Sequence, residues 1–368
     1  MSDWHASAAR AADRIWYGDS VWRWALWPLS AVFRALVAVR ASLYAAGIKR
    51  SVRLPVPVVV VGNVTAGGTG KTPLVVWLAR ELASRGHSPG VVTRGYGGSA
   101  ERSPRRVTAE SPAAEAGDEP VLLAARTGRP VYAGADRVAA ARALLRAAPE
   151  VDVLVFDDGL QHYRLARTFE IAVVDGARGL GNRLCLPAGP LREPAARLRT
   201  VDAIVVNEGS SAGASGAAAN ARPDVLASLP DAVLRVPMTL SVTRVYRIAD
   251  GAEAPLDAFR GRTVHAVAGI GHPERFFRML ETAGITVLRH PLPDHAKLRA
   301  EDLPRNPAVP VLTTEKDAVK LRGTAADDVW CVAVEAVVRA SDRARLVAAV
   351  EAAMLAHASA RADHPVQS

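Results

Sequence analysis

A glycine-rich segment, NVTAGGTGKTP at residues 63–73, has the composition of a loop that binds nucleotide phosphates. An apolar run typical of a buried parallel strand precedes it, and a helical pattern follows it. The glycines allow backbone conformations that direct N–H groups at phosphate oxygens, and the helix N-terminus adds partial positive charge. Lys71 would reach the β- and γ-phosphates, and the Thr72 hydroxyl would bind Mg²⁺. The predicted nucleotide-binding residues are Thr65, Ala66, Gly67, Gly68, Thr69, Gly70, Lys71 and Thr72.

This segment departs from the pattern G-x-x-x-x-G-K-[ST], because Thr65 stands where the first glycine is expected. Its core is closer to the G-G-x-G-K-T loops of the ParA-like group, but the lysine that often precedes those glycines is Ala66 here. A glycine-rich turn without a ligand is the structural alternative. The apolar run before the segment and the helical pattern after it favour nucleotide binding.

Two adjacent carboxylates follow a second apolar run, in VDVLVFDDGLQH at residues 151–162. In a parallel sheet, the carboxyl end of such a strand faces the phosphate-binding loop. Asp157 and Asp158 would therefore bind Mg²⁺ directly or through water. The alternative is an exposed Asp-Asp-Gly turn, but a phosphate-binding loop earlier in the chain favours the magnesium site.

Other polar motifs are less specific. Asp118, in GDEP, is a candidate general base, although its spacing favours the N-cap of a helix. Arg94, in TRGYGG, follows another apolar run and could hold a phosphate, or belong to a plain turn. The segment LPAGPLREP at 186–194 is a loop rich in proline and glycine, and Asp294 and His295 form a short polar cluster. An Asp-His pair is usually a turn, but a histidine can also pair with a carboxylate across a cleft.

The first 53 residues carry eight basic and three acidic side chains, a large share of the chain's net charge of +9. The apolar run 25–39 is shorter than the ~20 residues that cross a bilayer and contains Arg34, so we do not expect it to span a membrane. An amphipathic helix in the membrane interface explains both the arginines and the tryptophans. The alternative is a helix packed on the protein's own core. The tryptophans are Trp4, Trp16, Trp22, Trp24 and Trp27.

Composition is that of a globular protein, with 49% apolar and 23% charged residues. The spacing of Cys185 and Cys331 suggests neither a disulfide framework nor a zinc site, which fits a reducing compartment. The pattern predicts an α/β fold: a P-loop core with a mostly parallel sheet, a smaller C-terminal α/β domain and an N-terminal membrane-associated helix. The expected divisions are 1–52 (helical region), 53–235 (kinase core), 236–261 (inter-domain strands) and 262–360 (C-terminal domain).

Taken together, the motifs resemble the tetraacyldisaccharide 4′-kinase family, the lipid A 4′-kinases of Gram-negative bacteria. The resemblance rests on GNVTAGGTGKTP, TRGYGG, GDEP, FDDGLQH, LPAGPLREP, the PDH at 293–295 and TTEKDAVKL at 313–321, which follow the family's order. It implies phosphorylation of the 4′-hydroxyl of a tetraacyldisaccharide 1-phosphate with ATP and Mg²⁺ at the cytoplasmic face of the inner membrane. The partners implied are this lipid and an anionic membrane surface, with no nucleic acid and no obligate protein partner. An Ala/Gly/Ser run at 209–221 departs from the family pattern and indicates a local loop expansion.

The resemblance also implies residue roles. Asp118 becomes the base, assisted by His295, while Lys71 neutralises the transferred phosphoryl group and Asp157 and Asp158 remain the metal ligands. The implied substrate-binding residues are Arg94, Tyr96, Glu119, Gln161, His162, Arg192 and Glu193.

Two rival functions have weaker support. A P-loop switch protein would explain the loop, but no guanine-specific N-K-x-D follows the carboxylate strand and the ParA-like lysine is missing. A nucleic-acid-binding module would explain the positive charge, but more than half of that excess lies in the tryptophan-rich N-terminus and no nucleic-acid motif follows.

Overall fold

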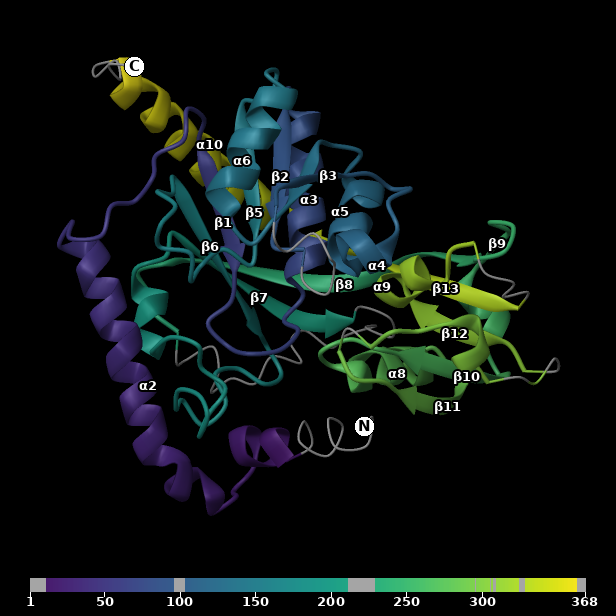
Figure 1. Ribbon diagram of the computed structural model, residues 1–368. Helices are drawn as coiled ribbons and strands as arrows, with labels where there is room; N and C mark the ends of the chain where they lie inside the picture. The colour runs from purple at the N-terminus through teal and green to yellow at the C-terminus, as the bar shows by residue number, and fades with distance from the viewer. Residues whose placement is uncertain are drawn as a thin grey trace.

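A mixed, mostly parallel β-sheet forms the centre of the protein, as the computed structural model shows (Figure 1). The structure describes residues 11–95, 103–210, 229–294, 296–304, 306, 309–323 and 328–362. Within them the 13 strands follow the order β11-β10-β12-β13-β8-β7-β6-β1-β5-β2-β4-β3, with β9 paired to β8. The expected α/β class with a mostly parallel sheet is confirmed. The Ala/Gly/Ser run lies largely outside the described residues.

The strands are β1 (Val58–Gly62), β2 (Pro89–Thr93), β3 (Arg105–Val107), β4 (Val131–Ala133), β5 (Val153–Asp157), β6 (Phe169–Asp175), β7 (Ala203–Ser210), β8 (Leu234–Arg247), β9 (Glu253–Ala254), β10 (Thr263–Ala268), β11 (Thr286–Pro291), β12 (Val311–Thr314) and β13 (Val329–Val338). The α-helices are α2 (Trp22–Ala45), α3 (Lys71–Ser84), α4 (Ala113–Ala116), α5 (Asp118–Thr127), α6 (Arg137–Ala147), α8 (Pro273–Thr282), α9 (Glu315–Ala318) and α10 (Ala340–Ala362). Short 3₁₀ turns include η5 (Val319–Leu321).

Strand β1 is buried along its whole length because both faces of the sheet are covered there. Val59 and Val61 pack with α3, α5 and α10 on one face. Val58 and Val60 pack on the other face with α6 and with loop residues between 160 and 201. β-Branched side chains suit this position between two covered faces, so the sequence places β1 at the centre of the sheet.

The sheet continues without a break into the C-terminal half, because β8 pairs with β7 in parallel and with β13 in antiparallel. Helix α8 covers β10 through Phe276, Phe277 and Leu280, which form the core of this half (Figure 1). The expected inter-domain strands (236–261) thus consist of one long strand, β8, which belongs to both halves, followed by the short β9. The domain boundaries themselves stay a prediction.

Helix α2 lies along the outside of the molecule (Figure 1). It has 24 residues, so the expectation that this region is too short to span a membrane is wrong: by length and composition it could cross one. The helix extends beyond the apolar run 25–39 by three residues at its N-terminal end and by six residues after Val39. Only a narrow stripe of α2 contacts the body, and Ser30 is its single buried residue. Trp22, Trp24, Leu29 and Leu36 remain exposed.

Candidate functional site

The predicted site lies at one edge of the sheet. Strands β1, β2, β5, β6 and β7 run parallel, so the residues that follow them meet at the same edge. The glycine-rich segment follows β1, and the paired carboxylates Asp157 and Asp158 come at the end of β5. In the register of the sheet, Val61 pairs with Asp157, which brings the two motifs side by side.

The segment between β1 and α3 is a tight loop that ends in a helix N-terminus. Gly67 and Gly70 have φ angles of 97° and 93°, which side chains other than glycine rarely adopt. The Asn63 side chain spans the loop, because its Nδ2 donates to the Gly67 carbonyl (3.2 Å) while its Oδ1 accepts from Lys71 Nζ (3.1 Å). Lys71 is the first residue of α3, and its ammonium is therefore held over the loop.

The two carboxylates differ in environment. Asp158 Oδ1 lies 3.4 Å from Lys71 Nζ, and Arg192 donates to both of its oxygens at 3.1 and 3.0 Å. Asp157 is 1% exposed, its Oδ2 lies 3.4 Å from the Thr93 hydroxyl, and its Oδ1 has no hydrogen-bond partner among the described residues. A buried carboxylate oxygen without a donor is suited to bind a cation.

The electrostatics follow these contacts. Burial, with Glu119 nearby, raises the pKa of Asp157 to about 7. Burial also opposes ionisation of Asp158, but Lys71 and Arg192 outweigh it and hold the pKa of that carboxyl well below its usual range. Protein cations therefore outweigh burial at Asp158, whereas at Asp157 burial and the neighbouring carboxylates outweigh Lys71 and Arg137.

The loop expected at 186–194 runs beside the glycine-rich loop. The Ala66 amide donates to the Pro190 carbonyl (2.7 Å), and the Arg192 amide donates to the Val64 carbonyl (2.7 Å). The Ser30 hydroxyl of α2 accepts from the Ala188 amide of this loop (2.9 Å) and donates to the carbonyl of Cys185, directly before the loop (2.8 Å). One loop thus connects the exposed apolar helix to the candidate nucleotide site.

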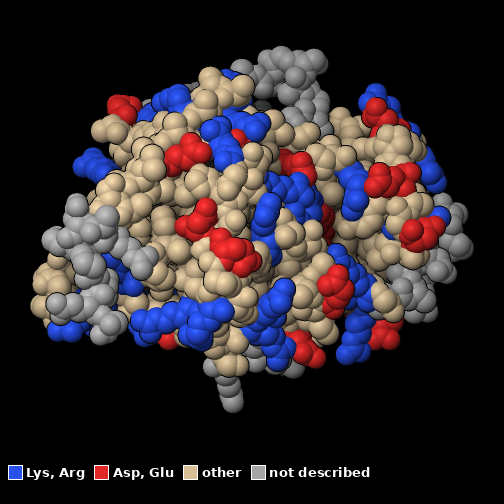
Figure 2. Space-filling model, turned by 90° about the horizontal axis from the view of Figure 1, so that it is seen from above, with Lys and Arg blue, Asp and Glu red and all other residues tan. Residues whose placement is uncertain are grey.

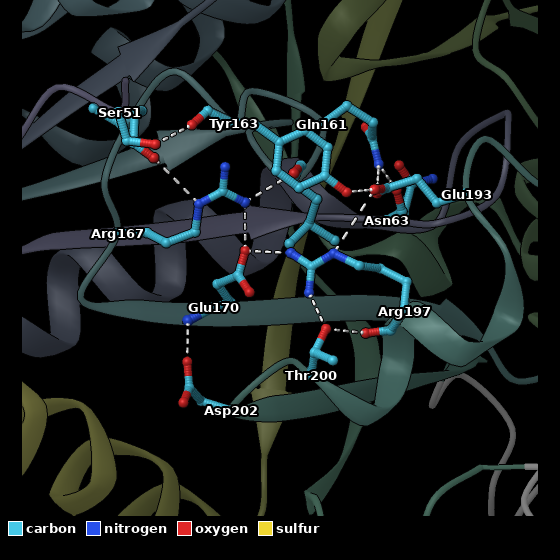
Figure 3. Close-up of polar contacts among 12 residues, drawn as sticks. Ser51, Asn63, Gln161, Tyr163, Arg167, Glu170, Glu193, Arg197, Thr200 and Asp202 are labelled. Carbon is cyan, nitrogen blue, oxygen red and sulfur yellow. Dashed lines mark hydrogen bonds and ion pairs between the residues drawn. The ribbon is translucent and has the colours of Figure 1, made fainter. Parts of the chain in front are cut away.

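Gln161 and Glu193 belong to a buried polar network beside β1 (Figure 3). Gln161 Nε2 donates to the Asn63 carbonyl (3.1 Å) and to Glu193 Oε2 (2.7 Å), and the Tyr163 hydroxyl donates to Glu193 Oε1. Arg197 joins this network to Glu170. Glu193 is 1% exposed, and it contacts the glycine-rich loop indirectly, through Gln161 and the Asn63 carbonyl.

Asp118 is the first residue of α5, and its N-cap is Gly117. The expectation that Asp118 itself caps this helix is therefore wrong, because Gly117 already takes the non-helical conformation (φ 90°). Asp118 is 5% exposed and lies 3.3 Å from Lys320 Nζ of the C-terminal half. Its neighbour Glu119 binds Lys316 Nζ (3.0 Å), which also binds Asp294 Oδ1 (2.8 Å).

Comparison with known proteins identifies the family. A family model described as tetraacyldisaccharide-1-P 4′-kinase (LpxK) matches residues 22–354. The chain belongs to this family. The tetraacyldisaccharide 4′-kinase of Nitrosococcus oceani is 46% identical to this chain, and the match covers 92% of this chain and 94% of that protein. The tetraacyldisaccharide 4′-kinase of Azoarcus sp. is 51% identical, over 83% of this chain and 85% of that protein. The expected activity, that of a kinase of lipid A biosynthesis, is confirmed at the level of the family.

The fold agrees with this membership. A crystal structure of LpxK from Aquifex aeolicus, described as an "apo" form in complex with ATP, superposes with a TM-score of 0.72 at 27% identity. The match covers 91% of this chain and all of that one.

The remaining predicted residues of this LpxK-family chain are placed as follows. Arg94 follows β2 at the same edge of the sheet and is exposed. His162 Nε2 is buried and has no hydrogen-bond partner among the described residues, and burial together with Arg137 and Arg167 lowers the pKa of His162 to about 4. Tyr96 and His295 lie outside the described residues.

Two residues of the site were missed by the sequence analysis. Arg137, 5% exposed at the start of α6, donates to the carbonyls of Asp157 (2.9 Å) and Asp158 (3.1 Å). Asn207, fully buried near the end of β7, donates from Nδ2 to the Thr69 carbonyl (2.9 Å). The available signal for Asn207 was a polar residue after the apolar run 203–206, but such residues are common, and Arg137, separated by three residues from the end of β4, carried no such signal.

Proposed function

We propose that the protein transfers the γ-phosphoryl group of ATP to the 4′-hydroxyl of tetraacyldisaccharide 1-phosphate at the carboxyl edge of β1 and β5. The observation that carries this proposal is the convergence of Lys71 and Asp158, whose Nζ and Oδ1 atoms lie 3.4 Å apart. A loop lysine beside a strand-end carboxylate is the arrangement that phosphoryl transfer from a nucleotide requires.

The residues present fit a nucleotide. Residues 65–72 form the P-loop, whose two left-handed glycines shape a backbone cradle for phosphate. The Thr69 hydroxyl in this loop is buried without a hydrogen-bond partner among the described residues, so a phosphate oxygen could satisfy it. Lys71 would neutralise charge on the transferred group.

The residues also fit Mg²⁺, which typically takes one or two carboxylates together with phosphate oxygens. Asp157, Asp158 and the Thr72 hydroxyl would hold the ion. The unpartnered Asp157 Oδ1 supports this assignment, since a cation would compensate the charge that burial disfavours. When bound, Mg²⁺ supplies neutralisation of the phosphate oxygens during transfer.

Asp118 accepts the proton of the 4′-hydroxyl as that oxygen forms a bond to the γ-phosphorus and the bond to the β-phosphate oxygen breaks. His295 orients Asp118 or shares its charge. Support comes from the contact that Lys316 makes with both Glu119 and Asp294, because it brings the residue preceding His295 close to the start of α5. Closure of the C-terminal domain over the core would then exclude water.

The roles of the remaining residues follow from the family resemblance. Arg94, Glu119 and His162 line the space for the sugar headgroup, and Tyr96 binds the sugar. Arg192 holds Asp158 and contacts substrate, whereas Glu193 acts through Gln161. The lipid chains lie against the apolar face of α2, which docks on the membrane at the cytoplasmic face.

The distribution of surface charge favours the proposed kinase function over nucleic-acid binding. On the face in Figure 2, basic and acidic side chains are interspersed, so the net positive charge is not gathered there into one patch. An electrostatic footprint for nucleic acid would be a continuous basic stripe.

The test is lipid phosphorylation in detergent with radiolabelled Mg-ATP and tetraacyldisaccharide 1-phosphate. We expect label in the lipid, and none with Lys71→Ala. ATP hydrolysis without any labelled lipid, and unaffected by lipid, would overturn the proposal and favour a switch ATPase.

A further inference from the structure

Two lysines of the segment TTEKDAVKL have no role in the function proposed above. Lys316 in α9 and Lys320 in η5 are four residues apart, a spacing that puts both side chains on the same side of a helical segment. Their side chains are only 11% and 10% exposed. Both ammonium groups face the start of α5, where Asp118 and Glu119 lie.

A second carboxylate, that of Asp317, also holds Lys320. Its Nζ donates to Asp317 Oδ1 at 2.8 Å, and Asp317 is fully buried. Asp317 Oδ2 in turn accepts from the Gly269 amide (2.8 Å) and from the Thr314 hydroxyl (2.7 Å). Strands β10 and β12 carry these two donors near their carboxyl ends, so Asp317 is fixed by the sheet of the C-terminal half.

The contact between Asp317 and Lys320 needs the absence of a side chain at Gly269. A Cβ atom at Gly269 would lie 2.9 Å from Asp317 Oδ1, the oxygen that Lys320 uses. Hydrogen bonds thus link the sheet to Asp317 and Asp317 to Lys320, whose Nζ lies 3.3 Å from Asp118 Oδ2. On the other side, Asp118 Oδ1 accepts from the Glu119 amide (2.9 Å).

We propose that Lys320 is a positioning residue for Asp118 and that Asp317 holds Lys320 in place. The inference rests on the proposed function, because it gives Asp118 the role of the base. The ammonium holds the Asp118 carboxylate in one orientation and favours its ionised form within a mostly buried site. Because the Lys320 ammonium contacts Asp317 and Asp118, its effect on catalysis passes through Asp118.

The test compares Lys320→Met and Lys320→Arg with the wild type. We expect Lys320→Met to lower kcat about 10- to 100-fold, since loss of orientation at a base costs this much, with KM for ATP within about threefold. Lys320→Arg, which keeps the charge, should recover part of the loss. Arg260→Met is the matched control: Arg260 also pairs with a carboxylate, Asp257, but on the exposed surface of the same half.

A double-mutant cycle separates positioning from general stabilisation. In an Asp118→Asn background, Lys320→Met should cause no further loss of kcat. An additional loss equal to that in the wild-type background would overturn the proposal. Thermal unfolding of each variant reports folding, and Lys320→Gln replaces Lys320→Met if the latter does not fold.

The two levels of the proposal fail in different ways. Full turnover of Lys320→Met beside an inactive Asp118→Asn would refute the positioning role alone. Full turnover of Asp118→Asn would refute the base assignment, and the positioning role with it. Absence of lipid phosphorylation in the wild type would refute the proposed function itself.

Discussion

Arg192 donates to both carboxylate oxygens of Asp158, at 3.1 and 3.0 Å, and thereby ties the loop at 186–194 to the end of β5. The same loop hydrogen-bonds to Ser30 of α2 through the Ala188 amide and to the glycine-rich loop through the Pro190 carbonyl. Arg192 therefore lies where α2, the carboxylate of Asp158 and the glycine-rich loop are connected.

Replacing Arg192 by Met should lower kcat about 10- to 100-fold, because Asp158 loses the cation that fixes its orientation. Asp158 is about one-third exposed, so the free energy of unfolding should change by about 1 kcal/mol or less. Steady-state kinetics with Mg-ATP and urea unfolding measure the two effects. Arg105→Met, which breaks the exposed pair with Glu115, is the control. A fall in kcat that is fully explained by unfolding of the variant would show that Arg192 has only a structural role.

Asn207→Ala should raise KM for ATP and destabilise the fold by about 1–3 kcal/mol, since the buried Thr69 carbonyl loses its donor. Gly70→Ala should have a related effect, because a Cβ there would lie 2.4 Å from Asn207 Nδ2 at a φ of 93°. ATP titration and denaturant unfolding test both variants. An unchanged KM for Asn207→Ala would show that the P-loop does not depend on this contact.

The exposed apolar face of α2 should bind anionic vesicles. Replacing Trp24 and Leu36 by Gln should reduce cosedimentation with such vesicles at least severalfold without lowering the thermal unfolding midpoint, because both side chains are 65% exposed. Leu355→Gln, a substitution of a similarly exposed apolar residue on α10, is the control. If the control lost vesicle binding to the same extent, α2 would not be the docking surface.

Stability should fall on acidification partly through His272. Burial, with Arg178 and Arg275 nearby, lowers its pKa to about 4, whereas in the unfolded chain the value is near 6.5. Between these pH values the unfolded chain binds the proton and the folded chain does not. The free energy of unfolding is therefore unaffected by His272 protonation above about pH 6.5, and it decreases as the pH falls from 6.5 towards 4.

The expected loss is about 1–2 kcal/mol, after a discount for the partial exposure of His272. Urea unfolding of the wild type and His272→Asn at pH 7 and pH 4.5 measures it. The variant should show the smaller pH dependence. An identical pH dependence in both proteins would exclude His272 as a contributor.

Much of the fold was predictable from local patterns. Strands β1, β5 and β6 are buried on both faces, so each reads as a short apolar, β-branched run between turns. The glycine-rich loop and the paired carboxylates were also predictable as local structure, because nearby residues make up each motif, while their roles in binding stay predictions. Strands β3 and β4 were missed, since three residues are too few to show a period.

The sequence by itself determined the α/β class, the glycine-rich loop before α3, the paired carboxylates at the end of β5 and the family to which the chain belongs, because contiguous residues carry each of these signals. Tertiary structure alone decided that one sheet runs through both halves, that Asn207 supports Thr69 from 138 positions away, and that Lys320 faces Asp118. Such pairs depend on which strands lie next to each other and on which side of a helix turns inward. Neither is encoded in the spacing of the residues along the chain.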